Sequence, residues 1–94
     1  MTYSLEFHPN FKKDLKNLDK KVAVEVRDIH LGRIYNNPFE NPKLKGDLDG
    51  VYSYHFKSNN TQYRIAYSVE NEEIIFYYMV AKRENFYKQL TNRI

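Results

Sequence analysis

The sequence predicts an α+β domain in which two N-terminal helices pack on an antiparallel sheet. Three observations support this class: an alternating segment at residues 3–7, apolar residues at helical spacing between residues 11 and 35, and three strand-like segments after residue 50. A chain of 94 residues can bury one hydrophobic core but not two independent ones. We therefore expect a single domain over residues 1–94, with the order β-α-α-β-β-β and a possible terminal helix.

The first half of the chain contains one strand and two helices. Residues 3–7 (YSLEF) alternate as a half-buried strand does. A first helix opens at Pro9, because proline is tolerated at the first helical position. The apolar stripe of this helix consists of Phe11, Leu15 and Leu18. Asp19 is a suitable N-cap for a second helix that runs to about Tyr35. Its expected buried side consists of Val22, Val26, Ile29 and Leu31 or Ile34.

Three strands and a short helix follow the loop at residues 36–50. Residues 51–57 and 62–69 flank the turn SNNT, and a second turn, ENEE, precedes residues 74–81. Residues 74–81 are apolar on both faces, which is typical of a central strand. The segment after residue 81 predicts a short helix with Phe86 and Leu90 directed inward.

The hairpin separates two kinds of side chain, because successive residues of a strand point to opposite faces. One face carries Tyr52, Tyr54, Phe56, Tyr63, Ile65, Tyr67 and Val69. The other face carries Ser53, His55, Lys57, Gln62 and Arg64. We expect the helices to cover the aromatic face, which leaves the polar face open to solvent or to a ligand.

The charge distribution indicates a polyanionic partner. The net charge is +3 and the pI is near 9.1. The positive excess lies in residues 43–64 and 82–94, which flank an acidic segment at residues 65–81. A local basic surface of this kind suits nucleic acid. The alternative is an ordinary solvated surface.

Several classes of chemistry have no support in the sequence. The absence of cysteine excludes disulfides, thiolate metal sites and cysteine nucleophiles, and it fits a reducing cytoplasm. No apolar run reaches the length of a signal peptide core or a membrane span, so we expect a soluble cytoplasmic protein. The histidines, at positions 8, 30 and 55, lack metal-ligand spacing, and glycine-rich nucleotide motifs and a serine-hydrolase motif are absent. We expect neither a metal nor a cofactor.

The remaining polar residues suit phosphodiester cleavage without a metal, in which cations stabilise charge on phosphate oxygens and a histidine or tyrosine handles protons. The candidates are His55, Arg64, Lys82, Arg83 and Tyr87, with Lys43, Lys45, Lys57 and Lys88 as further RNA-binding cations. Each of three residues has an ordinary alternative: His55 faces solvent, Arg64 pairs with a glutamate of the acidic turn, and Tyr87 packs under the terminal helix.

Three short motifs carry a resemblance to a known family. The runs KLKG (43–46), YRIAY (63–67) and KRENFY (82–87), in this order, resemble the RelE/ParE superfamily of toxin–antitoxin toxins, on the RelE side. The resemblance covers nearly the whole chain, because the element order, length and pI also match. It implies a ribosome-dependent mRNA endonuclease, or mRNA interferase. Such a toxin cuts the A-site codon by attack of the ribose 2′-oxygen on the adjacent phosphate.

The resemblance also implies roles for individual residues. Arg64 and Arg83 stabilise the transition state, and Lys43 and Lys45 hold the RNA backbone. Tyr87 orients or activates the 2′-hydroxyl, or stacks on a base.

The sequence departs from the family pattern at two positions. Some RelE toxins carry lysines where this chain has Ser53 and His55. His55 can act as a base instead, because the reference pKa of histidine is about 6.5.

Two further functions fit the same resemblance. Relatives on the ParE side inhibit DNA gyrase without cutting RNA, and a relative without catalysis would bind only the ribosome or RNA. In either case a cognate antitoxin is implied, in a heterodimer or heterotetramer. We expect an acidic helix or strand of the antitoxin to cover the basic face, against the sheet edge or the terminal helix.

Overall fold

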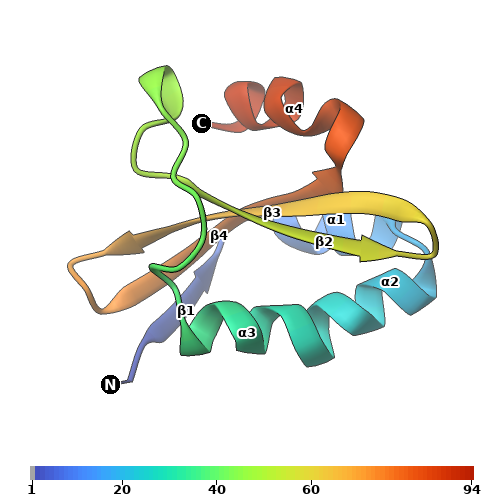
Figure 1. The fold of residues 1–94 in the computed structure, drawn as a ribbon, viewed down its shortest axis with the longest axis horizontal. Helices are drawn as coiled ribbons and strands as arrows, with labels where there is room; N and C mark the ends of the chain where they lie inside the picture. Colours follow the sequence, from blue (N-terminus) through green and yellow to red (C-terminus); the bar gives the residue numbers. More distant parts are fainter. Residues whose placement is uncertain (1) are drawn as a thin grey trace.

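The computed structural model describes residues 2–94 as a four-stranded sheet with helices on both faces (Figure 1). In chain order the elements are β1 (Ser4–Phe7), α1 (Phe11–Asn17), α2 (Lys20–Glu25), the π-helical turn η1 (Val26–His30), α3 (Leu31–Asn36), the 3₁₀ turn η2 (Gly46–Leu48), β2 (Tyr52–Ser58), β3 (Thr61–Glu70), β4 (Ile74–Lys82), the 3₁₀ turn η3 (Arg83–Asn85) and α4 (Phe86–Arg93). The predicted α+β class and element order are confirmed, including the terminal helix. No helix within residues 2–94 has the length and apolarity needed to cross a membrane.

The sheet is mixed rather than wholly antiparallel. Its strand order is β1-β4-β3-β2, and β1 runs parallel to β4, with Ser4 opposite Ile74 and Phe7 opposite Tyr77. The other neighbours are antiparallel. The parallel pair follows from the connections: the helical crossover returns the chain in the direction of β1, and two hairpins later β4 has that direction again.

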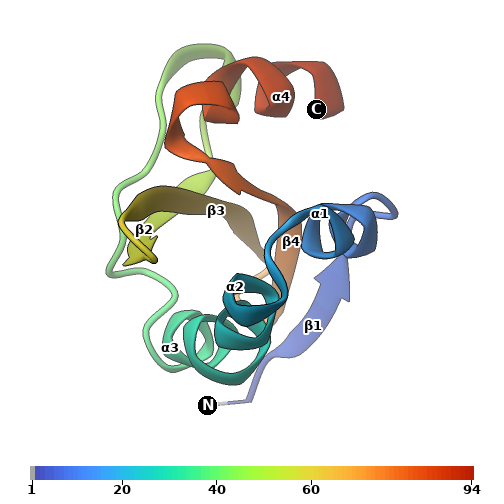
Figure 2. The same cartoon turned by 90° about the vertical axis from the view of Figure 1, so that its right-hand side faces the viewer.

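The sheet separates two cores (Figure 2). The core under α1, α2 and α3 contains the aromatic residues of the hairpin, as the sequence predicts: Tyr52, Tyr54, Phe56, Tyr63 and Tyr67. The core under α4 consists of Val51, Ala66, Met79, Ala81, Phe86 and Leu90. Phe86 and Leu90 point inward as predicted. Because α4 covers part of the polar face of the hairpin, only the rest of that face is open to solvent. The prediction that this whole face is uncovered was therefore wrong.

The π-helical turn changes which residues of the long helix are buried. A π turn holds one more residue than an α turn, so the inward position passes from Ile29 to His30. Ile29 is 44% exposed, contrary to the prediction, whereas His30 is buried. The His30 ring stacks on Phe56 at 4.0 Å between centroids, and its Nδ1 lies 2.8 Å from the Tyr54 hydroxyl.

The loop between α3 and β2 is tied to the sheet by one tyrosine. The Tyr67 hydroxyl donates to the Pro38 carbonyl at 2.6 Å and accepts a hydrogen bond from Asn41 Nδ2 at 3.0 Å. Burial raises the pKa of Tyr67 to about 12, so the hydroxyl keeps its proton. The loop then runs beside β2 from α3 toward α4 (Figure 2), carrying Lys43 and Lys45 along this edge.

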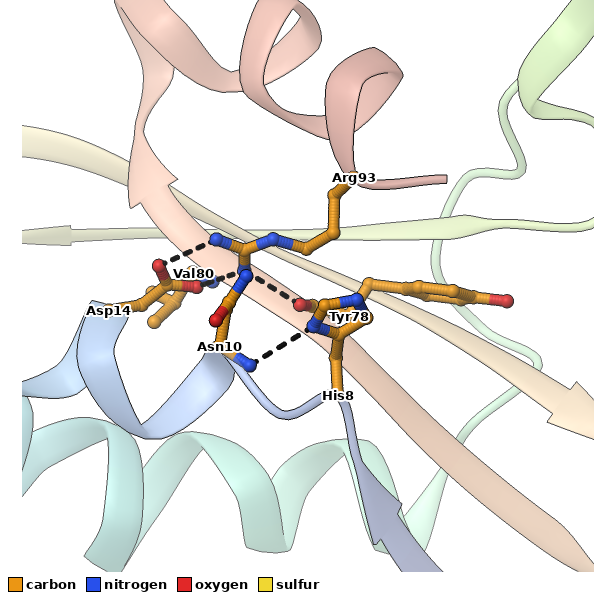
Figure 3. A network of polar contacts seen from close by, with 6 residues as sticks. All are labelled: His8, Asn10, Asp14, Tyr78, Val80 and Arg93. Atoms are coloured by element: carbon orange, nitrogen blue, oxygen red, sulfur yellow. Dashed lines mark hydrogen bonds and ion pairs between the residues drawn. The ribbon is translucent and has the colours of Figure 1, made fainter.

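Two side chains complete the outer edge of β4 beyond the end of β1 (Figure 3). Strand pairing stops where the His8 amide donates to the Tyr77 carbonyl. Past this point, Arg93 donates to the Tyr78 carbonyl at 2.8 Å, and the Val80 amide donates to Asp14 Oδ2 at 3.2 Å. Arg93 also binds both carboxylate oxygens of Asp14. The pair joins α1 to α4 and satisfies backbone groups that a neighbouring strand would otherwise bind.

Asp14→Ala should lower the free energy of unfolding by roughly 3 kcal/mol, because it leaves a mostly buried guanidinium without its counter-charge. The two side chains are only 12–13% exposed, so solvent screens the pair weakly. Urea denaturation followed by circular dichroism measures the loss.

Asp28→Ala is the matched control, because Asp28 pairs with Arg27 at an exposed site. That variant should lose less than roughly 1 kcal/mol. Equal losses for the two variants would contradict the structural role of the Asp14–Arg93 pair.

Candidate functional site

The centre of the candidate site is a contact between Arg64 and Tyr87. Arg64 lies on β3, on the face that α4 partly covers, and Tyr87 lies in the first turn of α4. Arg64 Nη1 donates to the Tyr87 hydroxyl at 3.0 Å, and Arg64 Cζ lies 5.7 Å from the centroid of the Phe86 ring. Among the described residues Arg64 forms no ion pair, so the alternative of a partner in the acidic turn is not observed. The guanidinium is held in place but keeps its full charge for an anion.

His55 lies directly opposite Arg64, on β2. Its Nε2 is 2.9 Å from the Ser53 hydroxyl oxygen. Although the His55 side chain is exposed, loss of water around the ring lowers its pKa, and the charge of Arg64 lowers it further. The lowered pKa favours the neutral imidazole near pH 7, and the tautomer in which Nε2–H donates to Ser53 leaves the Nδ1 electron pair free to accept a proton.

Ser53 differs from the expectation of an open polar residue. It is only 1% exposed, because it lies opposite Ala66 in the part of the sheet that the second core covers. A lysine at this depth would have to bury its charge. The hydroxyl of Ser53 instead orients the His55 ring.

Arg83 borders a pocket beside this centre. The pocket has a volume of about 460 Å³ and is lined by Asn60, Thr61, Gln62, Lys82, Arg83 and Glu84. Gln62 precedes Arg64 by two residues, so both point to the same face of β3. Arg83 thus lines the same pocket as Gln62, whose nearest neighbour on the same face of β3 is Arg64.

Two lysines of the hairpin region lie on opposite faces. Lys57 is exposed, pairs with Gln62 across the strands and shares the face of His55. Lys82 pairs with Tyr63, whose ring belongs to the core under the N-terminal helices. Strand alternation therefore directs Lys82 away from Arg64, although Lys82 is among the residues that line the pocket.

The other three candidate lysines lie in the loop before β2 and on α4. Lys43 lies at the β2 edge, with its Nζ 5.5 Å from the centroid of the Tyr52 ring on the helix-covered face. Lys45 is exposed in the loop before η2. Lys88 is exposed on α4, on the side opposite the buried Phe86 and Leu90. An RNA-binding role for these lysines stays a prediction.

The sequence analysis missed the polar pocket residues. Asn60 and its neighbour Asn59 both have positive φ, 62° and 53°, which places their side chains at a tight two-residue turn. Glu84 is the single acidic residue of the basic segment 82–94. A lone carboxylate among cations is the sequence feature that could have identified it as a candidate functional residue. Within residues 2–94, no three histidine, aspartate or glutamate side chains are close enough together to hold a metal ion.

Comparison with known families supports the architecture. A family model described as "ParE-like toxin of type II bacterial toxin-antitoxin system" matches residues 5–91. Comparison of the sequence with curated proteins found no significant match.

Among the solved structures that match are toxins of Mycobacterium tuberculosis and E. coli with the same fold. The toxin–antitoxin complex RelBE2 of Mycobacterium tuberculosis matches with a TM-score of 0.75 and 22% identity, over 88% of this chain and 100% of that chain. A mutant of the E. coli toxin RelE in the free state matches with a TM-score of 0.74 and 25% identity, over 99% and 94%. YafQ of E. coli matches with a TM-score of 0.65 and 15% identity, over 92% and 99%.

Arg64→Ala should raise the pKa of His55 toward 6.5, because it removes the positive charge opposite the ring while the desolvation remains. In the wild-type protein the midpoint should lie below 6.5. NMR titration of the imidazole signals measures both midpoints.

Arg33→Ala is the crossed control. Burial and then the charge of Arg33 lower the pKa of His30, so this variant should raise the midpoint of His30 and leave His55 unchanged. An unaltered His55 midpoint in Arg64→Ala would exclude electrostatic coupling across the hairpin.

Proposed function

Because the chain belongs to the ParE-like toxins of type II bacterial toxin–antitoxin systems, we propose that it is a metal-independent, ribosome-dependent mRNA endonuclease of the cytoplasm. The observation that carries this proposal is the grouping of three chemical functions on one face of the hairpin. A free guanidinium, a phenol and a neutral imidazole are supplied by Arg64, Tyr87 and His55. These are the groups that phosphodiester cleavage by a ribose 2′-hydroxyl requires.

Each residue has a defined part in the proposed reaction. His55 accepts the proton of the 2′-hydroxyl, and the 2′-oxygen attacks the adjacent phosphorus. The bond from phosphorus to the 5′-oxygen breaks, the 5′-oxygen takes up a proton, and a 2′,3′-cyclic phosphate remains. Arg64 and Arg83 stabilise the charge on the non-bridging oxygens. Tyr87, 49% exposed and bonded to Arg64, orients the 2′-hydroxyl or stacks on a base.

A second candidate function is toxin activity without RNA cleavage. The observation in its favour is that the buried Ser53 supplies no cation at a position where some RelE toxins carry a lysine. A gyrase inhibitor or a ribosome-binding domain would need a basic binding surface but would not need groups that cleave RNA. Function and fold are separable in this way, so the assay below tests both possibilities.

The partner that we propose is an antitoxin protein, and an apolar groove supports it. The groove, of about 450 Å³, lies between β1, α1 and η1 and includes Phe7, Leu15 and Leu31. Its neighbouring surface includes Val24 and a rim of lysines, Lys12, Lys16 and Lys20. An exposed apolar surface with a basic rim fits an acidic amphipathic segment. This surface is distinct from the basic face that the sequence analysis assigned to the antitoxin, and cover of that face stays a prediction.

Arg64→Ala should lower the rate of A-site cleavage by about 100-fold or more, because it removes a preorganised charge from the transition state. The assay uses ribosomes stalled on a defined mRNA with an empty A site, and primer extension locates the cut. Tyr87→Phe should keep most activity if the ring stacks, and lose it if the hydroxyl acts on the 2′-oxygen.

The control is Arg33→Ala, because Arg33 is exposed on α3 and lies outside the candidate site. This variant should cut at the wild-type rate. Full activity of Arg64→Ala, or no cut by the wild-type protein, would sink the proposed endonuclease activity. A supercoiling assay with DNA gyrase would then decide between the two non-cleaving alternatives.

Val24→Glu should weaken binding of the antitoxin about tenfold or more, because it places a like charge against an acidic partner and interrupts an apolar contact. The probe is the product of the small gene adjacent to this one, measured by co-purification and by rescue of growth. Lys21→Glu, on the same helix but outside the lining of the neighbouring surface that contains Val24, is the control. Equal loss of binding in both variants would count against the groove.

A further inference from the structure

The polar pocket at the end of the sheet has the size and lining of a binding site. It lies where β3 begins and β4 ends, with a volume of about 460 Å³. Pockets of roughly 300–1,000 Å³ hold drug-sized ligands. The space is therefore sufficient for one nucleobase with part of its ribose.

The walls of this pocket offer both hydrogen-bond donors and acceptors. The side-chain amides of Asn60 and Gln62 can donate and accept, whereas the carboxylate of Glu84 only accepts. The backbone at Asn60 is set by the two-residue turn, which the pair Ser58 and Thr61 closes. A wall of mixed donors and acceptors suits the edge of a base better than it suits a phosphate.

The pocket continues the candidate site by about the spacing of one nucleotide. Gln62 and Arg64 are two residues apart on the same face of β3, which is about 7 Å along a strand. Arg83 lines the pocket and is also a proposed phosphate ligand. A chain with its scissile phosphate at Arg64 therefore brings a neighbouring base to Gln62.

A base in this pocket would account for the carboxylate of Glu84 among the cations of the candidate site. Its carboxylate would repel an RNA phosphate, yet it lies beside Lys82 and Arg83 and forms an ion pair with neither. A carboxylate does accept hydrogen bonds from the exocyclic amino groups of bases. Adenine, cytosine and guanine carry such a group and uracil does not.

We propose that this pocket binds a base flanking the cleaved phosphate, that Glu84 accepts a hydrogen bond from its exocyclic amino group, and that the site thereby selects against uracil. The inference rests on the proposed endonuclease activity. Gln62 and Asn60 bond the remaining polar atoms of the base edge. Glu84 is thus a specificity-determining residue, and the phosphate chemistry stays with Arg64 and His55.

The test compares cytosine with uracil, which present an amino group and a carbonyl oxygen at the same ring position. Stalled ribosomes carry A-site codons that differ only in this base, at each nucleotide flanking the cut. The wild-type protein should cut the cytosine codon about tenfold faster at one of the two positions, since a good base contact supplies discrimination of this size. In Glu84→Gln the ratio should fall to near unity, because an amide can accept from the amino group or donate to the carbonyl.

Two variants separate specificity from catalysis. Glu73→Gln, in the turn at the opposite end of the sheet, should keep the wild-type ratio. Arg64→Ala should slow both codons without changing their ratio. If the wild-type protein cuts both codons equally at each position, or if Glu84→Gln keeps the preference, the pocket inference fails while the endonuclease stands. If the wild-type protein cuts no codon, the proposed function fails and the inference with it.

Discussion

The incomplete pairing of β4 is the constraint on which the rest of the structure depends. Its inner side pairs with β3 along its length, but its outer side meets β1 only from Ile74 to Tyr77. Backbone groups beyond that point need partners, since unpaired groups near the interior are costly. Asp14 and Arg93 supply them, and Arg93 in turn fixes the end of α4. Through α4, this requirement at the sheet edge determines where Tyr87 meets Arg64.

The two faces of the sheet have different tasks. The aromatic face is fully used in packing under the N-terminal helices. On the other face, α4 covers one part of the sheet. The remaining part, around His55 and Arg64, is polar. A small domain cannot cover both faces of four strands completely, so some strand surface remains for binding. The candidate site occupies the boundary between the covered and the uncovered part.

The sequence was informative wherever a local period decided the structure. Alternation predicted the faces of the hairpin, including the placement of His55 beside Arg64, because a strand has a fixed period of two. The terminal helix and its inward Phe86 were predicted from helical spacing. The roles of these residues are not fixed by spacing, because chemistry depends on charges and distances between segments that are remote in the chain.

The wrong predictions, and the features that were not predicted, have physical reasons that no local pattern contains. The π turn moved the inward position from Ile29 to His30. A bulge at Tyr78 shifted the register of β4, so that Met79 and Ala81 face α4 instead of continuing the face of Tyr77. The parallel pairing of β1 and the Asp14–Arg93 contact join distant segments, and only the complete tertiary structure determines them.

The span of the Asp14–Arg93 contact also has a consequence for synthesis of the protein. The two residues are 79 positions apart in the chain. Similarly, β1 can pair only after β4 has been synthesised. Loops of this length must close before native contacts stabilise them, so the protein can fold completely only when its C-terminal segments are present. Arg83 and Tyr87 also belong to these segments. The nascent chain thus cannot assemble its candidate site until α4 has left the exit tunnel of the ribosome that makes it.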